Sequence, residues 1–110
     1  MKRFCRLHVS VSPLGQAEVD RVVAALSDSG APPHWVRKVD RHQVYLLEAI
    51  AELELGDNDS EQGLEQQLSV AIWKKIGRYV KIVVDTTRDD MPADCFELNE
   101  RDYRKLMRTH

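Results

Sequence analysis

The sequence predicts an α+β fold, a ferredoxin-like βαββαβ two-layer sandwich extended by a short C-terminal strand and a helix. Three observations support it: segments of alternating apolar and polar residues, apolar stripes with helical spacing, and the order of the two along the chain. Two split βαβ units in this order place both helices on one sheet face and the first and third strands at the centre. With 110 residues and 43% apolar residues, one domain over 1–110 can bury its own core.

The first strand and helix are predicted from residues 5–30. Apolar and polar residues alternate over 5–11, which is typical of a half-buried strand. Ser12 and Pro13 then predict a helix start, with Ser12 as N-cap and Pro13 at the first helical position. Gly30 should end the helix, because a left-handed cap needs no Cβ. Its apolar stripe consists of Val19, Val22, Val23 and Leu26.

Two further strands are expected at 35–41 and 44–55, joined by a turn at 40–43. In the second of these, glutamates and apolar residues alternate with period two through Glu52 and Glu54, which favours a strand. The alanine, leucine and glutamate content of 44–55 would equally suit a helix, and this alternative stays open.

The central helix is predicted over residues 60–76. Asp59 or Ser60 is expected to cap it, and Gly77 follows it directly. Four apolar residues recur at steps of four and make one stripe that must rest on a sheet; they are Leu64, Leu68, Ile72 and Ile76.

The C-terminal part is expected to hold a strand at 79–85, a polar loop at 86–94 and a short strand at 95–98. Asn99 then predicts the N-cap of a last helix, with Asp102 reaching back as in a capping box.

Composition and motifs restrict the functional classes. The formal net charge of −2 does not indicate nucleic-acid binding, and carboxylates at Glu48 and Glu52 would repel phosphates.

The five glycines form no phosphate-binding cluster, and the histidines and cysteines lack metal-ligand spacing, so we expect no cofactor and no metal. Cys5 and Cys95 are expected to be reduced thiols in the core. The sequence shows no secretory or membrane-spanning signal, and we expect a soluble, cytoplasmic protein of bacterial type.

One weak candidate for chemistry is His8, on the polar face of the first strand. A proton-transfer role needs a neighbouring carboxylate, and Glu48 or Glu52 on the adjacent strand could provide it. This would make the chain a small enzyme or ligand binder.

The leading hypothesis is a non-catalytic protein-binding or regulatory module. It would contact a protein partner through the open sheet face, the acidic region 48–65, or both. An inhibitor or immunity protein that blocks a basic, nucleic-acid-handling enzyme is an alternative, and a homodimer is another. The expected partner-binding residues are Arg6, His8, Glu48, Ile50, Glu52, Asp57, Asp59, Glu61 and Trp73.

Overall fold

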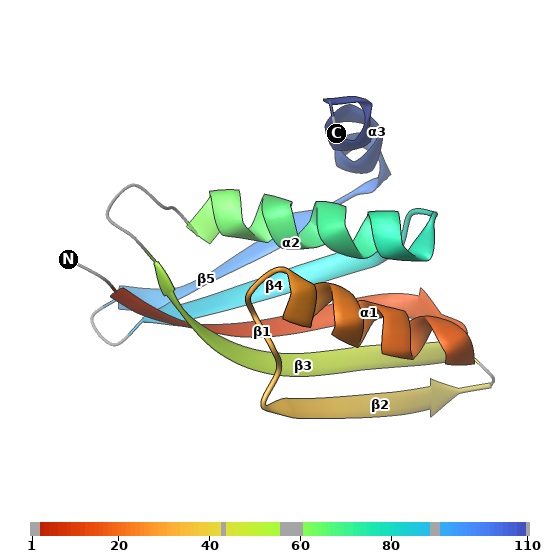
Figure 1. The fold of residues 1–110 in the computed structure, drawn as a ribbon, viewed down its shortest axis with the longest axis horizontal. Helices are drawn as coiled ribbons and strands as arrows, with labels where there is room; N and C mark the ends of the chain where they lie inside the picture. The colour runs from red at the N-terminus through yellow and green to blue at the C-terminus, as the bar shows by residue number, and fades with distance from the viewer. Residues whose placement is uncertain (1–2, 43, 56–60, 89–90, 110) are drawn as a thin grey trace.

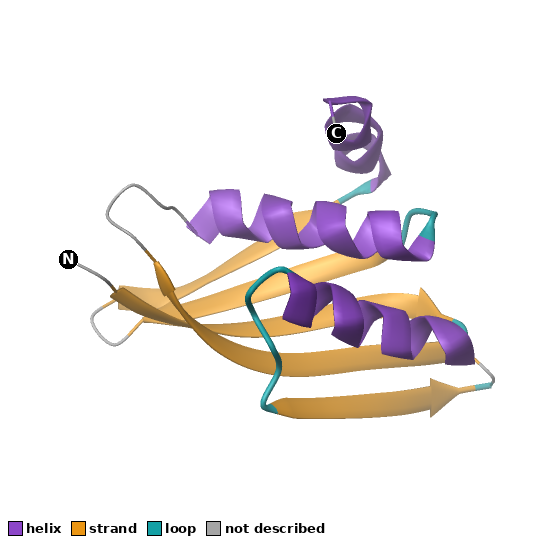
Figure 2. Cartoon of the chain, in the orientation of Figure 1, coloured by secondary structure: helices purple, strands orange, loops and turns teal. Residues whose placement is uncertain are grey.

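The computed structural model describes residues 3–42, 44–55, 61–88 and 91–109, and shows an α+β fold with a five-stranded sheet and three helices (Figure 1, Figure 2). The strands are β1 (Arg3–Leu14), β2 (Trp35–Arg41), β3 (Val44–Leu55), β4 (Lys81–Arg88) and β5 (Met91–Leu98). The helices are α1 (Gln16–Asp28), α2 (Glu61–Ile76) and α3 (Glu100–Thr109).

The sheet has the strand order β2-β3-β1-β4-β5, and every neighbouring pair is antiparallel. β1 lies at its centre and pairs with β3 on one side and β4 on the other. In register, Leu7 faces Ala51 on β3 and Thr86 on β4. β2 and β5 are the two edge strands.

The core lies between the sheet and the helices. α1 and α2 run side by side over one face of the sheet (Figure 1). α3 packs at the other side of α2, where the rings of Trp73 and Tyr103 meet edge to face with centroids 5.1 Å apart. Alternate residues of the central strands point into this core because side chains along a strand alternate between faces. They include Leu7, Val9, Val11, Leu47, Ala49, Ala51, Ile82 and Val84.

The start of α1 corrects the sequence interpretation. Residues 12 and 13 do not begin the helix, since β1 continues to Leu14 and Gly15 is the N-cap. The Gly15 N–H donates to Glu18 Oε1 at 2.8 Å, and the Glu18 N–H donates to the Gly15 carbonyl at 3.0 Å. Glu18 at the third helical position completes a capping box, and this competes successfully with the Ser-Pro signal. Gly30 follows the helix with φ +86°, as its predicted role requires.

The segment Val44–Leu55 is a strand over its whole predicted length, which settles the open alternative. The period-two pattern prevailed over helix propensity because every second side chain of its central part is buried against the helices. α2 begins at Glu61, within one residue of the prediction, and Gly77 follows it with φ +87°. The predicted capping residues Asp59 and Ser60 lie outside the described residues.

The predicted polar loop at 86–94 is wrong. β4 runs to Arg88 and β5 already begins at Met91, so the two strands form a hairpin that takes up most of this segment. Pro92 is compatible with a strand here because an edge strand has one row of backbone groups that need no partner. The short strand expected at 95–98 is therefore an eight-residue edge strand.

α3 begins as predicted. The Asn99 N–H donates to Asp102 Oδ2 at 3.1 Å, and the Asp102 N–H donates to Asn99 Oδ1 at 3.0 Å. These two bonds are the reciprocal pair of a capping box.

Candidate functional site

The sheet face opposite the helices, called here the outer face, carries the candidate site. Residues directly opposite one another on neighbouring strands point to the same face. The register therefore places one row of side chains across all five strands, and its members are Trp35, Ile50, His8, Asp85 and Cys95. A second row beside it consists of Arg37, Glu48, Ser10, Val83 and Glu97.

His8 lies between two carboxylates on the outer face. Its Nε2 is 3.2 Å from Glu48 Oε2 on β3, and its Nδ1 is 3.7 Å from Asp85 Oδ2 on β4. The His8 side chain is 35% exposed, so it is partly shielded but still reachable from solvent. A histidine in contact with a carboxylate has the geometry for hydrogen bonding to a polar ligand or for proton transfer.

The structure brings together only part of the predicted acid and base set. Glu48 contacts His8 as one of the two expected alternatives, whereas Glu52 lies near Arg6 at 3.6 Å and near His34 at 3.9 Å. Asp85 was missed as a neighbour of His8. Its position at the predicted end of a strand was visible in the sequence, but its register against β1 was not.

Cys95 ends the first row and is exposed, which corrects its predicted place in the core, while Cys5 is buried; neither forms a disulfide. A side-chain hydrogen bond with Asp85 is the largest effect that raises the pKa of the Cys95 thiol. A raised pKa keeps the thiol protonated, and the thiolate is the nucleophilic form. Cys95 is therefore poorly suited to nucleophilic chemistry.

Trp73 was predicted to bind a partner if exposed, and the structure corrects this. Its side chain is completely buried, and its Nε1 donates to the Val80 carbonyl at 2.9 Å. Tyr79 and Tyr103 also pack against its ring. Trp35, which the sequence interpretation did not include among the partner-binding residues, is the exposed tryptophan at 41%.

The acidic region 48–65 is divided by the fold. Glu48 and Glu52 belong to the outer face, whereas Asp57 and Asp59 lie outside the described residues. Glu61 begins α2, but the placement of its side chain also falls outside them. Glu65 is only 1% exposed, and burial raises its pKa to about 7.

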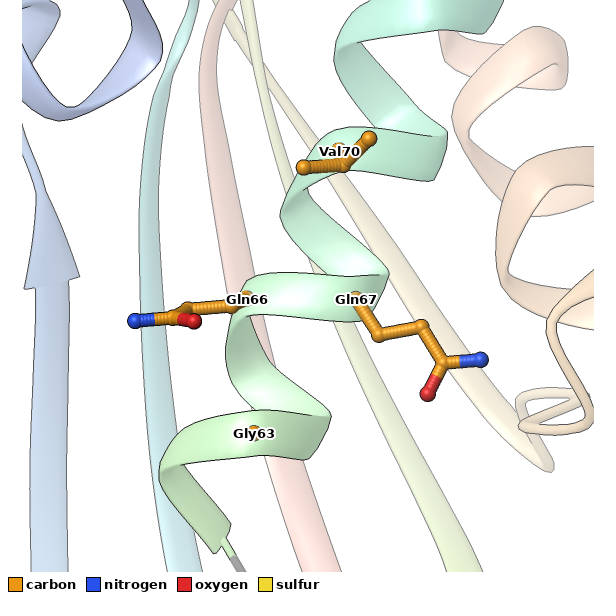
Figure 3. A pocket seen from close by; sticks show the side chains of 4 residues that line it. All are labelled: Gly63, Gln66, Gln67 and Val70. Atoms are coloured by element: carbon orange, nitrogen blue, oxygen red, sulfur yellow. The ribbon is translucent and has the colours of Figure 1, made fainter. Parts of the chain in front are cut away.

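A shallow hollow of about 240 Å³ lies on α2, lined by Gly63, Gln66, Gln67 and Val70. Figure 3 shows the two glutamine side chains pointing to opposite sides of the helix. Their amides do not converge on a common point, so this hollow offers no concentrated set of ligand-binding groups.

The described histidine, cysteine, aspartate and glutamate side chains form no group of three or more that could hold a metal ion. Among the described helices, none combines the length and the apolar character needed to cross a membrane.

Comparison with known proteins identifies no family: no family model and no curated protein matches the sequence. Among solved structures, the chain is similar to an unknown protein from Galdieria sulphuraria, with 12% identity, a TM-score of 0.49 and 86% of this chain covered. The chain spans about half of that protein, since the match covers 48% of it. It is also similar to a phage SAM lyase in the apo state, with 11% identity and a TM-score of 0.45, covering 89% of this chain and 90% of the other. Similarities this distant carry no argument about function.

Proposed function

We propose that this chain is a non-catalytic module that binds a protein partner through its outer face. The observation that carries the proposal is the one-sided distribution of the helices. α1 and α2 cover the inner face, while the outer face carries partly exposed apolar side chains between charged ones. The apolar members are Trp35, Val39, Leu46, Ile50 and Val83. A mixed surface with an exposed tryptophan has the composition of a protein interface.

We also infer that β1 to β4 with α1 and α2 constitute a ferredoxin-like unit, to which β5 and α3 are added. The order β2-β3-β1-β4 within the sheet supports this description. The cytoplasmic location expected from the sequence remains a prediction.

The test uses the full chain as bait for protein capture from cell extract. Ile50→Lys places a charge in the middle of the outer face, and Lys74→Glu changes an exposed residue of α2 as the matched control. We expect a partner that wild type and Lys74→Glu both retain and that Ile50→Lys loses. Equal retention by all three chains would contradict the proposal.

A binding site for a small polar ligand around His8 is the second candidate, because His8 contacts Glu48 and lies near Asp85. A fragment library screened by NMR would test it. We expect amide shifts that cluster at His8, Glu48 and Asp85 and disappear in His8→Ala; shifts that persist in His8→Ala would contradict this site.

An inhibitor of a basic enzyme receives less support from the geometry. Glu52 lies 3.6 Å from the Arg6 guanidinium, so its charge is partly compensated within the chain, and Glu48 is in contact with His8. The acidic residues 57–59 lie outside the described part and add no structural argument.

A further inference from the structure

β2 is an edge strand that the described residues of the chain leave uncovered. Six of its seven residues are exposed, and only Val39 is partly buried. Val36 points to the helix side of the sheet and is still 43% exposed, so none of the described helices shields this side of the strand. Figure 1 shows α1 lying over the sheet with β2 beyond it.

The backbone of β2 can accept another strand. In an antiparallel ladder, every second residue directs its N–H and C=O groups toward one neighbour and the remaining residues direct theirs to the other side. β3 takes up one side of β2, so alternate backbone groups of β2 face outward. β2 contains no proline that would remove a donor from this row.

The charges along β2 favour pairing with an acidic strand. The strand carries three exposed cations, Arg37, Lys38 and Arg41, against the single carboxylate of Asp40. This is a local reversal of the net charge of −2 of the whole chain. Cations lie on both sheet faces, because Arg37 is opposite Glu48 on the outer face while Lys38 stacks over the Tyr45 ring at 5.0 Å.

Pairing of β2 with a second copy of this chain is less favourable than pairing with an acidic strand. Two copies joined through β2 would bring six cations together, and lysine on an edge strand is a common means of preventing such association. Joining β2 of one copy to β5 of another would combine opposite charges, but Pro92 removes one donor from β5. A strand that carries carboxylates and no proline would avoid both the repulsion between cations and the missing donor.

We propose that β2 binds an extended acidic segment of a partner protein, which adds to the sheet as a sixth strand. Backbone hydrogen bonds along β2 would supply affinity, and carboxylates near Arg37, Lys38 and Arg41 would supply specificity. Trp35, exposed at the start of the strand, would pack against an apolar residue of the segment. The inference rests on the proposed protein-binding function and specifies its partner.

The experiment selects binders of the full chain from a displayed library of random seven-residue peptides. We expect enrichment of sequences that combine several Asp or Glu residues with β-branched residues. One enriched peptide is then synthesised with a fluorophore, and its dissociation constant is measured by anisotropy. We expect Arg37→Glu/Lys38→Glu to weaken binding by about tenfold or more. Lys74→Glu/Lys105→Glu makes the same charge change on two exposed helix residues and should leave affinity unchanged.

Two further versions of this peptide are N-methylated at alternate residues, one at the even and one at the odd positions, so that each lacks one row of backbone N–H donors. Only one of the two should bind about tenfold or more weakly, because only one row of donors faces β2. If Arg37→Glu/Lys38→Glu does not fold by circular dichroism, Arg37→Gln/Lys38→Gln provides the same test with smaller perturbation.

Several results would overturn the inference: no enriched peptides, enrichment of neutral or basic sequences, or affinity unaffected by both the β2 substitutions and N-methylation. Its failure is distinguishable from failure of the proposed function. A captured partner that Ile50→Lys loses and Arg37→Glu/Lys38→Glu retains would leave the outer face as the interface and exclude the edge of β2.

Discussion

Glu65 and Ser69 lie one helical turn apart on α2, and both side chains are buried. Glu65 Oε1 and Ser69 Oγ have no hydrogen-bond partner within the part of the chain that the structure describes. A buried carboxylate without a partner is costly when charged. Burial, with a smaller contribution from the charge of Asp102 on α3, therefore raises the pKa of Glu65 to about 7.

Glu65 should make the stability of this protein depend on pH. Its pKa is higher in the folded state than the ordinary value of 4.5, so the folded chain retains a proton that the unfolded chain loses. The free energy of unfolding should therefore fall as pH rises from about 4.5 to about 7, by on the order of 3 kcal/mol. Urea unfolding at pH 5, 6, 7 and 8 measures this decrease.

Glu65→Gln should remove most of that decrease, because its amide does not ionise. Glu52→Gln changes an exposed carboxylate of the outer face and serves as the control that keeps the pH dependence. A Glu65→Gln chain whose stability falls with pH as steeply as wild type would show that the dependence comes from another group.

Glu18 joins the start of α1 to Arg78, which lies in the link between α2 and β4. It accepts hydrogen bonds from the Gly15 N–H and from the Arg78 guanidinium, which also donates to the Pro13 carbonyl at 2.9 Å. The hydrogen bond from Arg78 is the largest effect that lowers the pKa of Glu18. Its stabilisation should be fully present above pH 4.5 and decrease as pH falls through the lower folded pKa.

Glu18→Gln should lower the free energy of unfolding by about 1 kcal/mol at pH 7, because a charged acceptor is lost. The loss should be smaller at pH 3, because this pH lies below the ordinary pKa of 4.5 and the unfolded chain then binds more protons than the folded chain. Asp20→Asn alters an exposed carboxylate two residues away and should change stability little. Equal destabilisation at both pH values would argue against an ionised Glu18 as the source.

The two tryptophans should be distinguishable by fluorescence. Trp73 is completely buried and Trp35 is 41% exposed, so iodide should quench only the emission of Trp35. Trp35→Phe should leave a blue-shifted emission that iodide does not quench. Trp73→Phe should leave a red-shifted emission that iodide quenches. Quenching of the Trp35→Phe chain would place Trp73 at the surface, contrary to the structure.

Trp73→Phe should also destabilise the fold by about 2 kcal/mol. The substitution removes the hydrogen bond to Val80 and leaves space beside Tyr103. Trp35→Phe changes an exposed side chain and should cost little; chemical denaturation of both variants measures the difference.

The capping box of α3 should contribute measurably to stability. Asn99→Ala removes the oxygen that accepts from the Asp102 N–H and should cost about 1 kcal/mol. Asn99→Asp retains an acceptor at this position and should preserve most of the stability. If the alanine and aspartate variants unfold at the same urea concentration, the cap does not support α3.

Local patterns in the sequence were sufficient for most elements. The period-two alternation in Val44–Leu55 predicted a strand, and the four-residue repeat in α2 predicted a helix, because each pattern reflects which side chains must be buried together. Asn99 and Asp102, three residues apart, correctly predicted the start of α3, since a cap depends only on local backbone geometry.

Contacts between distant segments required the tertiary structure. β5 became a full strand because β4 offered an edge to pair with, although its own residues resembled a loop. Asp85 lies near His8, and Trp73 is enclosed by Tyr79 and Tyr103, only because strand register and helix packing bring them together. The sequence alone determined most of the elements and the faces they bury, because these follow from short-range periodicity. Tertiary structure alone decided which residues share the outer face and the edge, because pairing depends on register between segments far apart in the chain.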